Sequence, residues 1–243
     1  MIKTLYCGGD SWTEGDELGL PYVHGITDLY MLNNSWPAKL AELLNVSMFV
    51  NEGLGGTSNT RIFRKAVKFI REYSKKADTK QLMVVVCWTT LDRDEIPIDL
   101  KADKDWYIPI QQYGVNWPNH SEVNKLDTVT KTALEQIHKP YTITIGNKSR
   151  TNLHIERMWQ LKQICQSLNV KLVQTFALDI PAFDPNDDRF VKEYQNEIGY
   201  LDEIFINYCR KKNYPLAPGG HCYEQGHEGW AKYINEHINN SLL

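Results

Sequence analysis

Two segments near opposite ends of the chain carry residue types suited to acyl transfer. YCGGDSWTEGDE, residues 6–17, places Ser11 just after a short apolar run and two glycines. PGGHCYEQGHEGWA, residues 218–231, places His221 in a loop ahead of an apolar helical pattern. A serine hydroxyl is a weak nucleophile that needs a base within hydrogen-bonding reach, and imidazole is the most frequent such base. The two segments predict Ser11 as the nucleophile and His221 as the base.

Acyl transfer also requires hydrogen-bond donors aimed at the oxyanion of the tetrahedral intermediate. The backbone N–H of Ser11 is one candidate, because it lies at the start of a turn or helix. Gly56, in NEGLGGTSN, is a second, because a residue without a Cβ lets its N–H approach closely. Thr89 or Thr90, in WTTLDR, offers a hydroxyl as a third.

These residues need a scaffold that brings distant loops together, and the sequence alternates between strand and helix patterns. Apolar runs predict strands, and apolar residues at helical spacing predict helices between them. The strands are expected at 2–7, 46–51, 82–88 and 170–178, and the helices at 36–44, 62–73, 152–168, 198–208 and 230–238. Such alternation is typical of a parallel sheet covered by helices on both faces. Ligands bind such sheets beyond the carboxyl ends of the strands, where the candidate residues gather.

One segment interrupts this rhythm. The insertion at about 94–150 is far longer than an ordinary connection and is rich in aromatic residues, Trp106 and Trp117 among them. It is either a surface decoration or a lid over the site, and its place after a strand favours the lid. We therefore expect Trp106 and Trp117 to contribute to substrate binding.

Composition limits the classes of partner. The 243 residues, 42% apolar and 23% charged, suit a single globular domain over residues 1–243, and a net charge of −3 argues against a nucleic-acid or membrane partner. We expect no signal peptide, transmembrane segment, metal or cofactor, and a cytoplasmic location. The five cysteines form no C-x-x-C pair and predict reduced thiols. The composition does not indicate an oligomeric state.

Three blocks resemble the SGNH, or GDSL, hydrolases. GGDSWTEG is similar to that family's Gly-Asp-Ser-x-x-x-Gly, NEGLGGTSN to its Asn-x-Gly-x-x-Gly, and HCYEQGHEGWA to its His-Pro-x-x-x-Gly-His-x-x-Trp-Ala. The blocks follow the family's order over nearly the whole chain. The resemblance implies a flavodoxin-like three-layer α/β/α sandwich with a five-stranded parallel sheet in the order 2-1-3-4-5. It also implies a cofactor-free esterase, with Ser11 and His221 catalytic and Gly56 in the oxyanion hole.

The chain departs from the family pattern at two positions. The family's third block, Gly-x-Asn-Asp, is absent, and Thr89 is the best substitute for its oxyanion asparagine. The family's catalytic aspartate, three residues before the histidine, is replaced by Pro218. Asp179 is a possible surrogate, and a backbone carbonyl near Pro218 is the alternative that we favour.

Non-catalytic interpretations remain for each residue. Ser11 could cap a helix with Glu14 in a capping box, and His227 suits a helix face bonded to backbone. The spacing of His221 and His227 matches no zinc site. The sequence predicts a serine esterase for a small or glycan ester, with carbohydrate O-acetyl groups as the first guess. The alternative is an inactive protein of this fold that binds carbohydrate or another protein.

Overall fold

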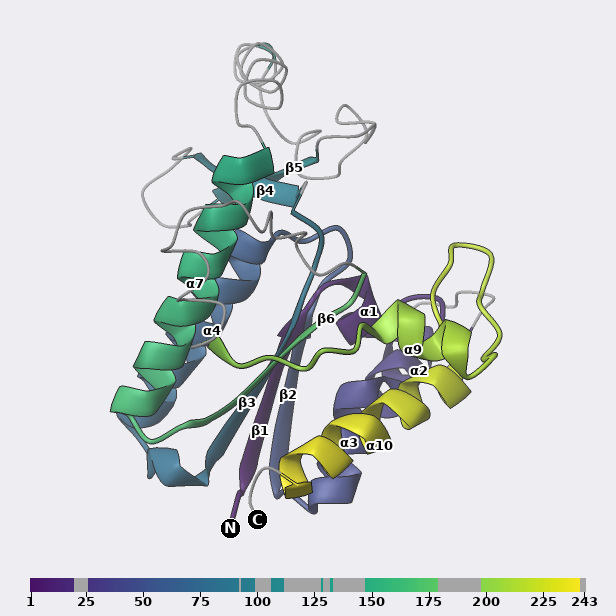
Figure 1. Cartoon of the computed structure of the whole chain (residues 1–243), viewed down its shortest axis with the longest axis horizontal. Helices are drawn as coiled ribbons and strands as arrows, with labels where there is room; N and C mark the ends of the chain where they lie inside the picture. Colours follow the sequence, from purple (N-terminus) through teal and green to yellow (C-terminus); the bar gives the residue numbers. More distant parts are fainter. Residues whose placement is uncertain are drawn as a thin grey trace.

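The computed structural model describes residues 1–19, 26–91, 93–98, 106–111, 128, 132, 147–178 and 198–240. A parallel sheet lies at its centre, built from β1 (Thr4–Gly9), β2 (Met48–Gly53), β3 (Leu82–Trp88) and β6 (Lys171–Phe176). The strands are ordered β2-β1-β3-β6, with Tyr6 opposite Val50 on one side and Val84 on the other. All run the same way, so their carboxyl ends form one edge of the sheet (Figure 1).

Helices cover both faces of this sheet and complete a three-layer sandwich (Figure 1). On one face lie α3 (Trp36–Leu44), α9 (Phe205–Lys211) and α10 (Glu224–Asn240). On the other lie α4 (Asn59–Ser74) and α7 (Asn147–Ser167). The short helices α1 (Ser11–Glu14) and α2 (Ile26–Asn34) follow β1 along the chain, and the 3₁₀ turn η1 (Thr79–Gln81) precedes β3.

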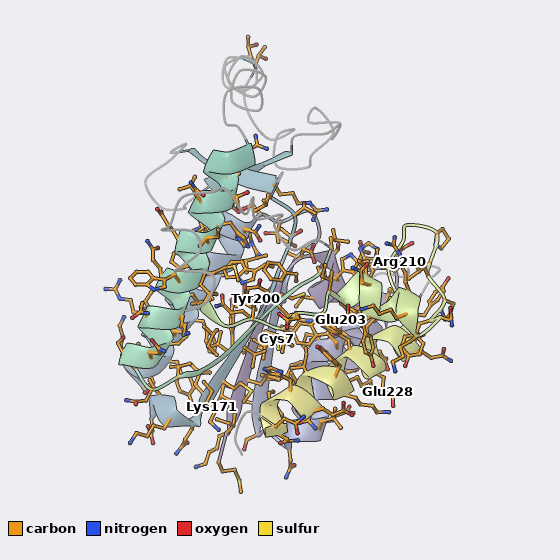
Figure 2. The ribbon with its side chains drawn as sticks, viewed as in Figure 1. Cys7, Lys171, Tyr200, Glu203, Arg210 and Glu228 are labelled. Atoms are coloured by element: carbon orange, nitrogen blue, oxygen red, sulfur yellow. A yellow bond between two sulfur atoms is a disulfide. The ribbon has the colours of Figure 1, made fainter. Side chains whose placement is uncertain are left out.

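The two cores follow from the alternation of side chains along the strands. Cys7 and Val85 point into the core beneath α10, whereas their neighbours Tyr6 and Val84 point into the core beneath α4 and α7. Figure 2 shows side chains filling both spaces, with Cys7 at the sheet. The runs in β1 and β3 are apolar throughout because both faces are covered.

The expected fold class is confirmed, but the sheet has four strands in the described residues rather than five. Residues 198–204 occupy the edge beside β6 with only two ladder contacts, a bond from Leu201 N–H to the Gln174 carbonyl and a bridge between Phe176 and Ile204. The helix predicted at 198–208 is correspondingly shorter, because α9 begins at Phe205. A cavity of about 370 Å³ lies beside this edge, lined in part by Val170, Leu172 and Ile198.

The cysteine prediction was partly wrong. Cys209 and Cys222 form a disulfide that joins α9 to the loop before α10, whereas Cys7, Cys87 and Cys165 are free and buried. Sequence spacing gave no sign of this pair, because the two residues meet only when α9 and α10 pack together. A disulfide is unusual in a reducing compartment, so it weighs against the cytoplasmic location, which stays a prediction.

The insertion begins with an antiparallel ribbon, β4 (Arg93–Ile98) and β5 (Trp106–Gln111). The ribbon follows the carboxyl end of β3 and is tied to α4 by an ion pair between Arg64 and Glu95 at 3.1 Å. Among the described helices, none is long and apolar enough to cross a membrane.

Candidate active site

Ser11 is the first residue of α1, at the carboxyl end of β1. Asp10, the N-cap, accepts a hydrogen bond from Trp12 N–H at 3.1 Å, and Gly15 ends the helix in a left-handed conformation. Ser11 is therefore not the cap, and the capping-box interpretation with Glu14 is wrong. The Ser11 hydroxyl is therefore not needed to cap α1.

The hydroxyl of Ser11 faces His221. Ser11 Oγ lies 2.8 Å from His221 Nε2, although 210 residues separate them in the sequence. The histidine loop is held by a bond of 2.8 Å from Ala217 N–H to the His221 carbonyl and by the disulfide at Cys222. The Trp12 ring packs beside the imidazole with centroids 5.2 Å apart. The structure thus brings together the predicted nucleophile and base.

The other ring nitrogen of His221 meets a carboxylate that the sequence analysis missed. Glu17 Oε2 lies 2.7 Å from His221 Nδ1. An ionised carboxylate can only accept hydrogen bonds, so Nδ1 carries the proton and Nε2 is left to accept one from Ser11. Serine, histidine and glutamate therefore form a continuous chain of the kind found in catalytic triads.

Glu17 is itself fixed by the loop that carries the histidine. Its carboxylate accepts bonds from Gly219 N–H at 2.6 Å and from His221 N–H at 3.1 Å. Burial alone would raise the pKa of Glu17, but the bonds from the His221 ring and from these two N–H groups outweigh it and lower the pKa. Glu17 also has a φ of 66°, a left-handed conformation that is rare for a residue with a side chain and typical of functional sites.

The expectation that a backbone carbonyl near Pro218 orients the imidazole was wrong, because the Glu17 carboxylate lies at Nδ1. Asp179 lies outside the described residues. The sequence held one signal for Glu17. It is an acidic residue in the same loop as Ser11, after β1, and this loop lies at the carboxyl edge of the sheet.

The loop after β2 borders Ser11, as predicted. A Cβ placed on Gly55 would lie 3.7 Å from Ser11 Cβ. The Gly55 N–H donates to Glu14 at 2.6 Å, so it is already used. Gly56 has a φ of 71°, which favours glycine, and its N–H has no hydrogen-bond partner among the described residues. This leaves Gly56 and Ser11 as the backbone candidates for the oxyanion.

Thr89 does not have the predicted role of oxyanion donor. Its hydroxyl donates to Asp10 Oδ2 at 2.6 Å, and a hydroxyl has only one proton to give. Arg93 Nη1 lies 3.2 Å from Thr89 Oγ1 and 3.4 Å from Asp10 Oδ2. Burial raises the pKa of Asp10, whereas the Thr89 bond and the Arg93 charge lower it. Thr89 therefore supports Asp10 and is not free to bind the oxyanion.

His227 is structural, as predicted. It is buried in α10, and its Nδ1 accepts a bond from Trp36 N–H at 3.1 Å. Burial lowers the pKa of His227 to about 3, so the ring is neutral. Within the described ranges, no group of three or more His, Cys, Asp or Glu side chains is arranged to hold a metal ion.

The aromatic residues of the insertion stay predictions. Trp106 is the first residue of β5, but its side chain is not described, and Trp117 lies outside the described residues. The start of the insertion is at the edge of the sheet that carries Ser11, as a lid requires.

Comparison with known protein families gives one match. The sequence profile of a "Family of unknown function (DUF6071)" matches residues 24–138, which is less than half of the chain. No match was found among curated proteins.

Solved structures give similarities of fold. A carbohydrate esterase family 2 enzyme with a carbohydrate binding domain, from Corynascus thermopiles (Myceliophthora fergusii), is 12% identical with a TM-score of 0.50, over 99% of this chain and 66% of that one. A member of the lipolytic protein G-D-S-L family from Veillonella parvula DSM 2008 is 13% identical with a TM-score of 0.46, over 97% of each chain. The psychrotrophic esterase EstA from Pseudoalteromonas sp. is 10% identical with a TM-score of 0.45, over 98% of this chain and 99% of that one. The carbohydrate esterase shares the α/β fold of this chain, and at 12% identity this similarity shows nothing about the reaction.

Proposed function

We propose that the chain is a serine esterase in which Ser11, His221 and Glu17 act as a catalytic triad. The observation that carries this proposal is the hydrogen-bonded chain from Ser11 Oγ through both ring nitrogens of His221 to Glu17 Oε2. Side chains from two ends of the sequence meet in the order that nucleophile, base and orienting acid require.

In the proposed reaction, Ser11 Oγ attacks the ester carbonyl carbon while its proton passes to His221 Nε2. Glu17 holds the ring in the required tautomer and stabilises the imidazolium that forms. The N–H groups of Ser11 and Gly56 bind the oxyanion. Collapse of the tetrahedral intermediate expels the alcohol, which takes the proton from His221. Water then repeats the sequence on the acyl-enzyme and releases the acid.

Acetyl esters of carbohydrates are the substrates to test first. The shared fold with a carbohydrate esterase motivates this choice, and a small acyl group suits a nucleophile that is only 7% exposed. We further propose that the insertion closes over the site, with Trp106 and Trp117 contacting the substrate. The inactive binding protein was considered because the family's aspartate is absent before His221. The Glu17 carboxylate lies at His221 Nδ1, so this reason for a second function no longer applies.

Labelling by a fluorophosphonate probe tests this proposal directly. The wild-type protein should gain one probe mass at Ser11 and hydrolyse p-nitrophenyl acetate, and Ser11→Ala should do neither. Thr57→Ala, which changes a buried hydroxyl in the loop after β2, is a matched control that should keep both properties. A folded wild-type protein that gains no adduct would contradict the proposal. Binding of glycans by such a protein would instead support the inactive alternative.

A further inference from the structure

The proposed reaction leaves the oxyanion with two backbone donors and no side-chain donor. Thr89 cannot serve, because its one proton is committed to Asp10 at 2.6 Å. Glu14 beside Gly55 and Glu17 beside His221 can only accept when ionised. Among the described residues, a side-chain donor close to Asp10 and Ser11 would have to come from a group other than these three.

Arg93 is the cation that the structure places there. As the first residue of β4, it reaches back from the insertion to the turn that precedes Ser11. Its Nη1 contacts Asp10 and Thr89, and its side chain is 19% exposed. Neither its Nε nor its Nη2 has a hydrogen-bond partner in the described part of the chain. A guanidinium has five N–H donors, so most of them stay available to a bound molecule.

Asp10 explains why a guanidinium can be held in this place. Its carboxylate is completely buried, and its two oxygens are divided between the nucleophile turn and the insertion. Oδ1 accepts from Trp12 N–H, and Oδ2 faces Thr89 and Arg93. The carboxylate therefore anchors one end of the guanidinium beside the residue that precedes the nucleophile.

We propose that Arg93 is a catalytic residue that donates a hydrogen bond from Nε or Nη2 to the ester carbonyl oxygen. This inference rests on the proposed function. As Ser11 Oγ bonds to the carbonyl carbon, the π pair moves to the oxygen, and the positive charge of Arg93 stabilises it. The proton of Ser11 goes only to His221.

The competing explanation is that Arg93 only positions Asp10 and, through it, the turn at Ser11. Thr89→Val removes the Thr89 bonds to Asp10 and Arg93 but keeps the contact of Arg93 with Asp10, so it measures how much activity depends on the support of Asp10. Arg93→Met removes the donors and keeps most of the side-chain volume. Arg71→Met removes an exposed arginine of α4 as a matched control.

The test is steady-state hydrolysis of p-nitrophenyl acetate, with fluorophosphonate labelling and thermal unfolding of each variant. Arg93→Met should lower kcat by about 10²–10³-fold, as loss of one oxyanion donor does in other hydrolases, while KM changes by less than about threefold. Arg93→Lys should recover part of kcat. Thr89→Val should lose less than about tenfold in kcat, and Arg71→Met should match the wild type.

Two results separate failure of this inference from failure of the proposed function. Equal losses of kcat in Thr89→Val and Arg93→Met, or a loss below about tenfold in Arg93→Met, would overturn the role of Arg93 while Ser11 is still labelled. Absence of both turnover and Ser11 labelling in the wild type would overturn the esterase and this role with it. Should Arg93→Met fail to fold, Arg93→Gln and Arg93→Lys supply the same comparison with a polar side chain retained.

Discussion

The Glu17 carboxylate and the His221 imidazole are in contact at 2.7 Å across 204 residues of sequence. Glu17 also accepts bonds from the two backbone N–H groups of Gly219 and His221. One side chain thus contacts the imidazole and the loop that carries it. Substitutions at Glu17 or Gly219 should therefore lower the rate of catalysis more than they lower the stability of the fold.

Glu17→Gln should lower kcat for ester hydrolysis by about 10³–10⁴-fold, close to the loss seen when the triad carboxylate of a serine protease is made an amide. The amide can donate to the imidazole and stabilise the wrong tautomer, in which Nε2 carries the proton and cannot accept from Ser11. KM should change little, because Glu17 does not contact substrate in the proposed reaction. Kinetics of p-nitrophenyl acetate hydrolysis give both constants.

Two carboxylate variants serve as controls for Glu17→Gln. Glu203→Gln breaks an ion pair with Lys211 at α9 and should leave kcat unchanged. Asp179→Asn should also be nearly silent, since Glu17 already meets Nδ1. A collapse of kcat in Asp179→Asn together with normal activity of Glu17→Gln would reverse the assignment.

Gly219→Ala should reduce activity with little loss of fold stability. A Cβ at this position would lie 2.6 Å from Glu17 Oε2, so the carboxylate has to move away from His221. We expect kcat to fall at least tenfold, since displacing a triad carboxylate removes part of what its deletion removes. Gly220→Ala is the matched control, because its Cβ meets no atom within 4 Å although its φ of 97° strains the backbone. Equal kcat losses in the two variants would point to loop strain and not to Glu17.

The fold could be predicted from sequence because its signals are local. Continuous apolar runs such as LMVVVCW at 82–88 specify strands covered on both faces, and helical spacing specifies the layers around them. The prediction of a helix over 198–208 was wrong for residues 198–204, because Ile198, Leu201 and Phe205 are spaced like one face of a helix. In the structure this segment lies beside β6 instead, and Leu201 N–H donates to the Gln174 carbonyl.

The site was predictable only where motif and topology agreed. Ser11 and His221 lie in loops that must converge at one edge of a parallel sheet, so their contact followed from the strand order. Glu17 was missed because its approach to His221 depends on the left-handed backbone at Glu17 and on bonds to the distant loop at Gly219. Neither leaves a pattern in the sequence. Thr89 was misassigned because its hydroxyl donates to Asp10, a contact between residues of different loops that the sequence does not show.

Stability should depend on pH through Glu17. Its pKa in the folded protein is lowered below the ordinary value of 4.5, so the ionised side chain stabilises the fold. This contribution is fully present above pH 4.5 and is lost as the pH falls through the lower, folded-state pKa. The glutamine of the Glu17→Gln variant cannot ionise, so this variant lacks the stabilising contribution of the carboxylate. The difference in free energy of unfolding between the wild type and Glu17→Gln should therefore narrow in acid, as urea titrations at about pH 7, 4 and 3 would measure. A difference that stays constant over this range would contradict the assignment.

The disulfide at Cys222, next to His221, predicts how many thiols react and how much stability its removal costs. Under denaturing, non-reducing conditions, alkylation should modify three cysteines, Cys7, Cys87 and Cys165, and after reduction all five. Cys209→Ser should lower the free energy of unfolding by about 3 kcal/mol, the value expected for a cross-link that closes a loop of roughly this length. Cys222→Ser should cost the same, and the double variant little more, because either change removes the same bond. Additive losses, or five reactive thiols without reduction, would show that the two sulfurs are not joined in solution.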